Sequence, residues 1–231
     1  MSTPLEIIYQ DSSVMVLNKP SGISLLADRS GAPCLWDQFA ELLGGKPYLV
    51  HRLDKPTSGV LILARTAESQ RRLTQAFQRR EVRKYYLAWV QGAPPAAGTI
   101  DLPLRKGRKS RFRIAGGRAE IERVGGLWRL RGSADATLAA PLNGHASQTR
   151  FRTLMQSGTR SLVLLQPLTG RTHQLRVHMA WISYPIMGDL LYGNPAAPSQ
   201  QAPRLQLHCH RLVVPGLPRL TAVQRADWLG D

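Results

Sequence analysis

The sequence predicts a fold that combines many short strands with a few helices in a chain of 231 residues. Runs of strand length are apolar or alternating; they lie at 7–9, 14–19, 60–64, 83–90, 127–131, 149–154, 161–166 and 205–214. Helical spacing of apolar residues occurs at 35–43, 66–81 and 171–182. Hydrophobic residues make up 43% of the chain, which is enough for a proper core.

The first part of the chain alternates strands with helices. The strands 7–9 and 14–19 flank turn-forming residues, which favours a pair of neighbouring strands. The helix 35–43 stops at Gly44-Gly45, because glycine commonly ends a helix. The continuous apolar run 60–64 is typical of a buried strand.

The next helix and strand carry basic and aromatic side chains. In the second helix Leu73 and Phe77 lie on one face, whereas the arginines lie elsewhere. The strand 83–90 alternates and is rich in aromatic residues. Tyr85 and Tyr86 point to opposite faces of it, so one can pack in the core while the other faces a cleft. A cleft tyrosine could stack on a base, although two ordinary strand aromatics would give the same pattern.

Residues 91–145 differ from the rest, because they are rich in proline and glycine and include the basic run 105–113, which contains no acid. We expect them to form an insertion with a few edge strands, such as 127–131. The insertion is expected to belong to a single domain that spans residues 1–231. Residues 132–144 are small and polar and are expected to form a loop.

Regular structure resumes after residue 145 with two strands that we expect to pair. Thr169-Gly170 then turns the chain into the third helix. The apolar face of this helix is formed by Leu175, Met179 and Ile182. His173 and Arg176 are three residues apart and lie on another face.

The chain is strongly basic, with 31 Lys and Arg against 15 Asp and Glu and a net charge of +16. Such a charge repels itself in a compact fold, and a polyanionic partner explains it best. Nucleic acid is the favoured partner, since no long basic amphipathic helix points to an anionic membrane surface. Solubility alone would need only a few units of charge.

Several function classes lack their motifs in this sequence. Cys34 and Cys209 form no CxxC pair, which argues against a disulfide framework or a zinc ribbon. The histidines show no metal-ligand spacing, and the P-loop, GxGxxG and GxSxG motifs are missing. No signal peptide and no run of membrane-spanning length is visible. We therefore expect a cytoplasmic protein that uses no metal and no cofactor and binds no membrane.

The most informative segment is His51-Arg52-Leu53-Asp54-Lys55-Pro56-Thr57-Ser58-Gly59, a polar stretch that runs straight into the buried strand 60–64. Asp54 is a candidate nucleophile or base, because the nearby Arg52 and Lys55 would keep its carboxylate ionised. The alternative is a turn aspartate that caps the residues after it and has a purely structural role.

This segment resembles the HRLDxxTSG signature of the RluA-type pseudouridine synthases. Further segments resemble motifs of the same family in the same order: 16–22 (VxNKPxG), 84–88 (KxYxA), 169–178 (TGRTHQxRVH), 185–193 (PIxGDxxYG) and 207–212 (LHAxRL). Together they cover nearly the whole chain apart from 91–145. A chance agreement of all these motifs is negligible.

The resemblance implies an α+β fold, with a central mixed, mainly antiparallel sheet flanked by helices and a catalytic cleft across its middle. It also implies an isomerase that converts uridine to pseudouridine within rRNA or tRNA. In that reaction uracil is detached from C1′, turned, and rejoined through C5. The reaction involves no redox change and no group transfer to another molecule, so it needs no cofactor.

The resemblance also implies a role for individual residues. Asp54 corresponds to the essential aspartate, which either attacks C1′ or removes the 2′ proton, and the sequence leaves both routes open. Tyr86 corresponds to the tyrosine that stacks on uracil and helps remove the C5 proton. Arg176 corresponds to the basic residue that pairs with the aspartate and holds it ionised, which leaves Arg52 for RNA contact and base flipping. RNA contacts are expected from Arg52, His51, Arg171, His173, Gln174, Arg105, Lys106, Arg108, Lys109 and Arg111.

No S4-like RNA-binding domain is visible before residue 5, so RNA docking is expected to rest on the basic surface of the catalytic domain, acting as a monomer. The run 105–113 is expected to bind RNA and to help choose the substrate. The alternative is an RNA-binding protein that has lost catalysis and acts as a chaperone, yet Asp54, Tyr86 and Arg176 are all present. A nuclease would need a metal cluster or a paired acid and base, which the sequence lacks.

Overall fold

The computed structural model describes residues 5–27, 31, 34–108, 111–132, 144–193 and 202–222. The chain divides into two compact units. The first comprises Met1–Tyr86 together with Leu207–Asp231, and the second comprises Leu87–Gln206. Strand β5 (Arg83–Gln91) therefore begins in the first unit and ends in the second. The single domain over 1–231 stays a prediction.

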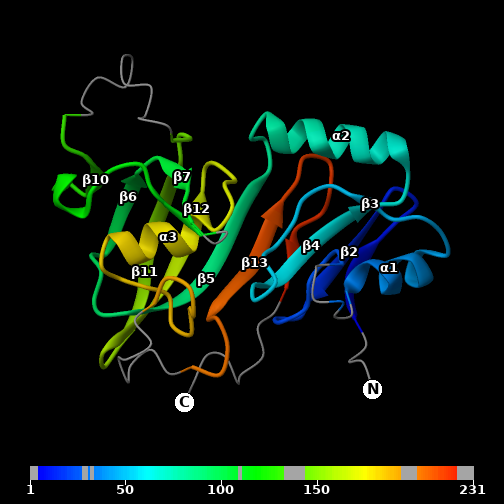
Figure 1. Ribbon diagram of the computed structural model, residues 1–231. Coiled ribbons are helices and arrows are strands. Elements are labelled where there is room, and N and C mark those ends of the chain that lie inside the picture. The colour runs from blue at the N-terminus through cyan, green and yellow to red at the C-terminus, as the bar shows by residue number, and fades with distance from the viewer. Residues whose placement is uncertain are drawn as a thin grey trace. The chain divides into compact units, whose positions relative to one another are not determined.

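The first unit is built on strands in the order β1-β2-β4-β13, with β3 beside β4 and β14 beside β13 (Figure 1). Their bounds are β1 (Glu6–Gln10), β2 (Val14–Lys19), β3 (Tyr48–Leu49), β4 (Ser58–Ala64), β13 (Leu207–Val213) and β14 (Leu220–Thr221). β2 and β4 are antiparallel, whereas β4 and β13 are parallel. β4 is buried along its whole length, as its apolar run predicts.

Two helices complete the first unit. Helix α1 (Leu35–Leu43) buries Leu35 and Phe39 in a cluster with apolar residues of β2 and β4, and ends at Gly44 in the left-handed conformation, with φ of 62°. Helix α2 (Ala67–Gln78) begins after Thr66, whose hydroxyl accepts the backbone N–H of Ser69 at 3.1 Å. It ends earlier than predicted, because Arg80 adopts a φ of 60° that no helix continues.

The second unit holds strands in the order β5-β12-β11-β6-β10-β9. Their bounds are β6 (Ala97–Asp101), β9 (Ile121–Val124), β10 (Leu127–Leu130), β11 (Gln148–Ser157) and β12 (Arg160–Pro167). β6 and β10 are parallel, whereas β6 and β12 each pair antiparallel with β11. The predicted α+β class, with a mixed and mainly antiparallel sheet, is confirmed.

Residues 91–145 contribute more regular structure than predicted. β6 lies between β11 and β10, so it is an inner strand and the expectation of edge strands alone is wrong. β7 (Leu104–Lys106) and β8 (Phe112–Ile114) form a separate antiparallel hairpin, and a short 3₁₀ helix (Arg118–Glu120) precedes β9. Most of the predicted loop 132–144 lies outside the described residues.

Helix α3 (Gln174–Trp181) lies against β12 and β8 in the second unit (Figure 1). It starts later than predicted, because His173 adopts a left-handed φ of 56° and the residues before it form a turn. The predicted division into an apolar and a polar face is wrong, since every residue from 174 to 180 is buried. The polar side chains of α3 therefore need partners inside the protein.

Candidate active site

The loop that carries Asp54 joins β3 to β4 and is held by the segment that follows β2. The backbone N–H of Gly22 donates to the Lys55 carbonyl at 2.9 Å. The Ser21 hydroxyl donates to the Pro56 carbonyl at 2.6 Å. These bonds fix the backbone between Asp54 and β4 and satisfy carbonyl groups that a turn leaves unpaired.

A buried lysine also binds the Asp54 loop. Lys19, the last residue of β2, is 1% exposed, and its ammonium donates to the carbonyls of Pro20 (2.7 Å), Thr57 (2.9 Å) and Lys55 (3.1 Å). Three acceptors match the three protons of an ammonium group. Burial lowers the pKa of Lys19 to about 7, and the charge of Asp54 opposes this shift. Lys19 therefore ties the loop to β2 and places a cation in electrostatic range of its carboxylate.

Sequence reasoning overlooked Lys19: it considered Arg52 and Lys55 as cations that keep Asp54 ionised, and then preferred Arg176 for that role. The side chains of Arg52 and Lys55 are exposed, so water screens their charges more strongly than that of a buried ammonium. A lysine that ends an otherwise apolar strand was the available signal. The turn itself is closed by the backbone, because the N–H of Thr57 donates to the Asp54 carbonyl at 3.0 Å.

Replacement of Lys19 by methionine tests this bracing. Lys19→Met leaves three loop carbonyls without their donor, so we expect a loss of about 2 kcal/mol in the free energy of unfolding. A loosened Asp54 should also lower the catalytic rate by roughly tenfold or more. Urea denaturation and a rate assay measure the two effects. The exposed Lys46→Met is the matched control, and wild-type values for both variants would show that Lys19 does not brace the loop.

Tyr86, on β5, is 8% exposed and lies in electrostatic range of Asp54. Burial raises the pKa of Tyr86 well above its usual value, and Cys209 and Asp54 act in the same direction. The phenol is therefore protonated near neutral pH, so it can donate a hydrogen bond but is a poor base. Burial likewise raises the pKa of Cys209 to about 12, which keeps the neighbouring thiol neutral. Within the first unit, the charge of Asp54 therefore acts on the Tyr86 phenol.

His51 is engaged with the fold beside this site. Its Nε2 accepts the backbone N–H of Ile62 at 3.1 Å, and its ring stacks on Phe77 at a centroid distance of 4.8 Å. Burial, assisted by the charge of Lys84, lowers the pKa of His51 to about 3, so the imidazole is neutral. The imidazole ring thereby accepts the Ile62 N–H of β4 in place of a backbone carbonyl of a neighbouring strand. The predicted contact of His51 with RNA stays a prediction.

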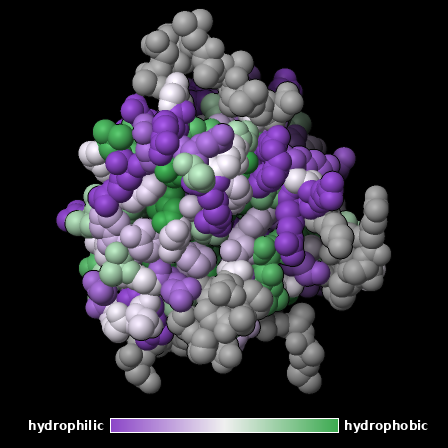
Figure 2. All heavy atoms as spheres, turned by 60° about the vertical axis from the view of Figure 1, so that its left-hand side comes forward, coloured by the Kyte–Doolittle hydropathy of each residue, from purple (hydrophilic) through white to green (hydrophobic). Residues whose placement is uncertain are grey.

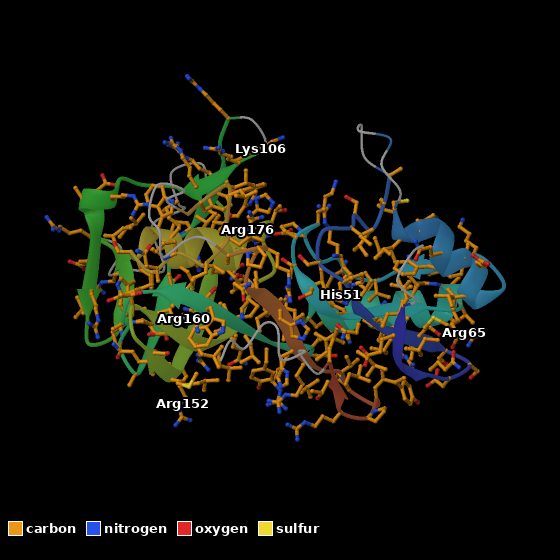
Figure 3. All side chains as sticks on the ribbon, turned by 90° about the horizontal axis from the view of Figure 1, so that it is seen from below. His51, Arg65, Lys106, Arg152, Arg160 and Arg176 are labelled. Carbon is orange, nitrogen blue, oxygen red and sulfur yellow. The ribbon has the colours of Figure 1, made fainter. Side chains whose placement is uncertain are left out.

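In the second unit, Arg176 on α3 (labelled in Figure 3) is buried. It forms a bidentate ion pair with Asp189. Its Nε lies 2.8 Å from Oδ2 and its Nη2 lies 2.7 Å from Oδ1. Oδ1 also accepts the backbone N–H groups of Leu191 (2.9 Å) and Tyr192 (3.2 Å). Sequence reasoning did not single out Asp189, although it lies in the PIxGDxxYG segment. The pairing of Arg176 with Asp54 stays a prediction.

Gln174 supports the turn before α3. Its Oε1 accepts from the Thr169 hydroxyl (2.7 Å) and the backbone N–H of Arg171 (3.0 Å). Its Nε2 donates to the Gln148 carbonyl (2.9 Å) and the Thr149 hydroxyl (3.0 Å). These bonds use the full capacity of a side-chain amide, which indicates a structural role. The predicted contact of Gln174 with RNA stays a prediction.

His173 connects the turn before α3 to the β7–β8 hairpin. Its Nδ1 lies 2.8 Å from the Tyr192 hydroxyl, and that hydroxyl accepts the backbone N–H of Phe112 at 2.9 Å. The rings of Phe112 and His173 also meet edge to face, at a centroid distance of 5.8 Å. The hairpin is therefore anchored beside the Arg176–Asp189 ion pair, within the same unit.

The β7–β8 hairpin is strongly basic. Arg105 and Arg113 lie directly opposite each other on the two strands, an arrangement that destabilises an isolated pair of strands. Lys106, Arg108 and Arg111 are exposed, and Lys109 lies outside the described residues. Figure 2 shows hydrophilic side chains over much of the face that this unit presents, and Figure 3 shows Lys106 on β7. A polyanionic ligand would relieve the repulsion.

The remaining predicted contact, Arg171, is exposed, and its Nε donates to the Ala146 carbonyl at 3.3 Å. Arg52, in the first unit, is exposed as well. Within the described parts of the chain, no cluster of His, Cys, Asp and Glu could hold a metal ion. No helix among those residues is long and apolar enough to cross a membrane.

The described site thus combines a carboxylate on a braced loop, a tyrosine whose pKa is affected by that carboxylate, and, in the second unit, a basic hairpin. Residues 13–181 match the family described as RNA pseudouridylate synthase, and the chain belongs to this family. The predicted RluA-type family and the predicted isomerase class are confirmed.

Similar proteins agree along most of the chain. The dual-specificity RNA pseudouridine synthase RluA of Salmonella typhi is 37% identical over 214 residues, which cover 91% of this chain and 86% of that protein. The tRNA pseudouridine synthase C of Salmonella typhimurium is 35% identical over 218 residues, covering 90% and 79%. The solved structure of human RNA pseudouridylate synthase domain containing 4 is 27% identical, with a TM-score of 0.77, covering 97% and 90%.

Proposed function

We propose that this RNA pseudouridine synthase isomerises specific uridines of structured rRNA or tRNA, with Asp54 as its catalytic carboxylate. The assignment of Asp54 rests on one observation, the bracing of its loop. Lys19 at the end of β2, and Ser21 and Gly22 in the segment after it, hold this loop by hydrogen bonds. The names of the relatives support both classes of RNA, since one is dual-specificity and the other acts on tRNA.

Two routes are open to the Asp54 carboxylate. It can form a bond to C1′ while the C1′–N1 bond breaks, which gives a covalent ester and a free uracil anion. It can instead take the proton from C2′ while the same bond breaks, and return it later. In the first route C5 of the turned uracil displaces the Asp54 carboxylate from C1′, so the ester bond breaks as the C–C bond forms. In the second route C5 bonds to C1′ while the proton returns to C2′. In both routes the C5 proton is then lost and N1 gains a proton. Both routes need an ionised and rigidly aimed carboxylate, which the bracing by Lys19 supports.

The proposed role of Tyr86 is to stack on uracil and donate a hydrogen bond. Its raised pKa supports this role over proton removal, because a protonated phenol has little basicity. The effect of the Asp54 charge on its pKa supports a position near the glycosidic bond. Uracil that has left C1′ must stay in the site while it turns. The face of the Tyr86 ring can hold it there by stacking.

The proposed role of Arg176 is to orient the Asp54 carboxylate when RNA is bound. The bidentate contact with Asp189 fixes the plane of the guanidinium group, so little rotamer freedom is left to lose on pairing. The exposed Arg52 is proposed to contact the RNA backbone and to support flipping of the uridine out of its stack.

RNA docking is proposed to rest on the basic surface of the chain, acting as a monomer, with residues 1–231 as one catalytic domain and 91–145 as its basic insertion. We further propose that the enzyme works in the cytoplasm, where its substrate RNA lies, without a metal, a cofactor or a membrane partner. The basic hairpin, Arg171 and His173 supply the proposed contacts in the second unit.

The test of this function uses total RNA from a strain that lacks the enzyme. The purified protein is incubated with this RNA, and pseudouridines are mapped by carbodiimide-blocked primer extension. We expect new stops at a small number of uridines in rRNA, tRNA or both. The activity assignment fails if the wild-type protein restores no site at all.

If the β7–β8 hairpin binds RNA, its arginines contribute both to RNA affinity and to the salt dependence of that affinity. In the double variant Arg108→Ala/Arg111→Ala, we expect RNA affinity to fall by roughly tenfold and the slope of log affinity against log salt to decrease by roughly 2. Filter binding over a salt series measures both. The double variant Arg150→Ala/Arg152→Ala removes the same charge from exposed positions on β11 and is the matched control. Equal affinities and slopes in the two variants would exclude the hairpin from RNA binding.

A further inference from the structure

We infer that Tyr192 is a positioning residue that couples RNA binding on the β7–β8 hairpin to the orientation of Arg176. The inference rests on the proposed function and adds to it a physical link between substrate docking and catalysis. It is carried by contacts of one side chain, all within the second unit.

Tyr192 touches three parts of the proposed machinery at once. Its hydroxyl accepts the backbone N–H of Phe112 in β8 at 2.9 Å and is hydrogen-bonded to His173 Nδ1 at 2.8 Å. Its ring lies 5.2 Å from the guanidinium carbon of Arg176, a distance typical of a cation–π contact. Its backbone N–H donates to Asp189 Oδ1 at 3.2 Å. One residue therefore joins the hairpin, the turn before α3 and the buried ion pair.

The contact on the hairpin lies where RNA is expected to bind. Phe112, whose N–H the Tyr192 hydroxyl accepts, pairs with Lys106 across the hairpin and directly follows Arg111. A phosphate held by Arg111 therefore acts on the strand one residue from this hydrogen bond. A shift of β8 would therefore move the Tyr192 hydroxyl, and the planar ring would move together with it.

The contact on Arg176 makes such a movement relevant to catalysis. The guanidinium group is confined on its edge by Asp189 and on its face by the Tyr192 ring. Asp189 in turn accepts the Tyr192 backbone N–H, so the ring and the carboxylate move as one group. A hairpin held by RNA would thus hold the Tyr192 ring, and with it the paired Arg176 and Asp189, in one position, whereas an empty hairpin would allow this group to shift as a whole. Contiguous contacts of this kind can carry coupling, which a double-mutant cycle measures.

The test is a cycle between Tyr192→Phe and Arg111→Ala. Tyr192→Phe removes the hydroxyl and keeps the ring, and urea denaturation verifies that the variant is folded. We expect each single variant to lower kcat by roughly tenfold, and the double variant to lose little more kcat than either single one, because both break the same link. Tyr192→Phe should act on kcat with unchanged RNA affinity, whereas Arg111→Ala should weaken affinity as well. A purely structural tyrosine would not produce this split.

The control cycle combines Tyr192→Phe with Arg150→Ala, an exposed arginine on β11, and is expected to be additive. Additive losses of kcat in the Arg111 cycle, close to 100-fold in the double variant, would overturn the coupling. The proposed function would survive this result, because the wild type would still form pseudouridine. Unchanged kcat in a folded Tyr192→Phe variant would overturn it too. A wild type that forms no pseudouridine would instead remove the proposed function on which the inference stands.

Discussion

Asp54→Asn is expected to abolish pseudouridine formation, with a loss of at least roughly 10³-fold in turnover, while RNA binding is unchanged. An amide has nearly the shape of a carboxylate, but it neither forms the ester at C1′ nor accepts the C2′ proton. The backbone bond that closes the turn, from the Thr57 N–H to the Asp54 carbonyl, is not removed by the substitution. Single-turnover assays and filter binding on the same RNA separate chemistry from binding.

Asn in place of Asp also decides between the two interpretations of this residue. A structural turn aspartate would tolerate the change, since asparagine accepts the same hydrogen bonds. The exposed Asp101→Asn serves as the control and should match the wild type in both assays. Asp54→Asn with more than about a tenth of the wild-type rate would show that the carboxylate is not the reacting group.

Arg176→Lys is expected to have the second-largest effect, with a loss of roughly 100-fold in kcat/KM and about 3 kcal/mol in the free energy of unfolding. Lysine keeps the charge but cannot form the bidentate contact with Asp189, which leaves a buried carboxylate partly unpaired. Asp189 also holds the N–H groups of Leu191 and Tyr192, so the segment after it should loosen too. Urea denaturation and steady-state kinetics measure the two quantities.

The comparison for Arg176→Lys is Arg160→Lys, which changes an arginine whose guanidinium lies 4.5 Å from the Trp89 ring on β5. That variant keeps its cation–π contact, and we expect less than about 1 kcal/mol of destabilisation. If Arg176→Lys were as stable and as active as Arg160→Lys, neither the ion pair nor its geometry would matter to the enzyme.

The sequence predicted most of the strands and helices, because their signals are local. The apolar run of β4, the alternating β5 and the glycine that ends α1 each carry their own pattern. The start of α3 was wrong for a reason that is not local. Gln174 finds its hydrogen-bond partners in Thr169 and in β11, which are brought together only when the second unit folds.

The site shows the same division between local and distant information. Asp54 could be found from its motif, since a turn that leads into a buried strand is visible in the sequence. Lys19 could not be placed by spacing, because its acceptors lie 36 and 38 residues further along the chain. Asp189 was hidden in the same way, as its ion pair with Arg176 joins a helix to a later turn. Tertiary partners of buried charges are not encoded in any short pattern.

The parallel pairing of β4 with β13 has a consequence for the order in which the enzyme is assembled during synthesis. The strand that leads out of the Asp54 loop has Ser58 opposite His208, and the two side chains are 3.0 Å apart. Because β13 follows Leu87–Gln206 in the chain, the whole second unit is synthesised before β4 can gain this neighbour. Nascent chains and products of premature termination that lack residues 207–213 should consequently remain inactive towards the RNA around them.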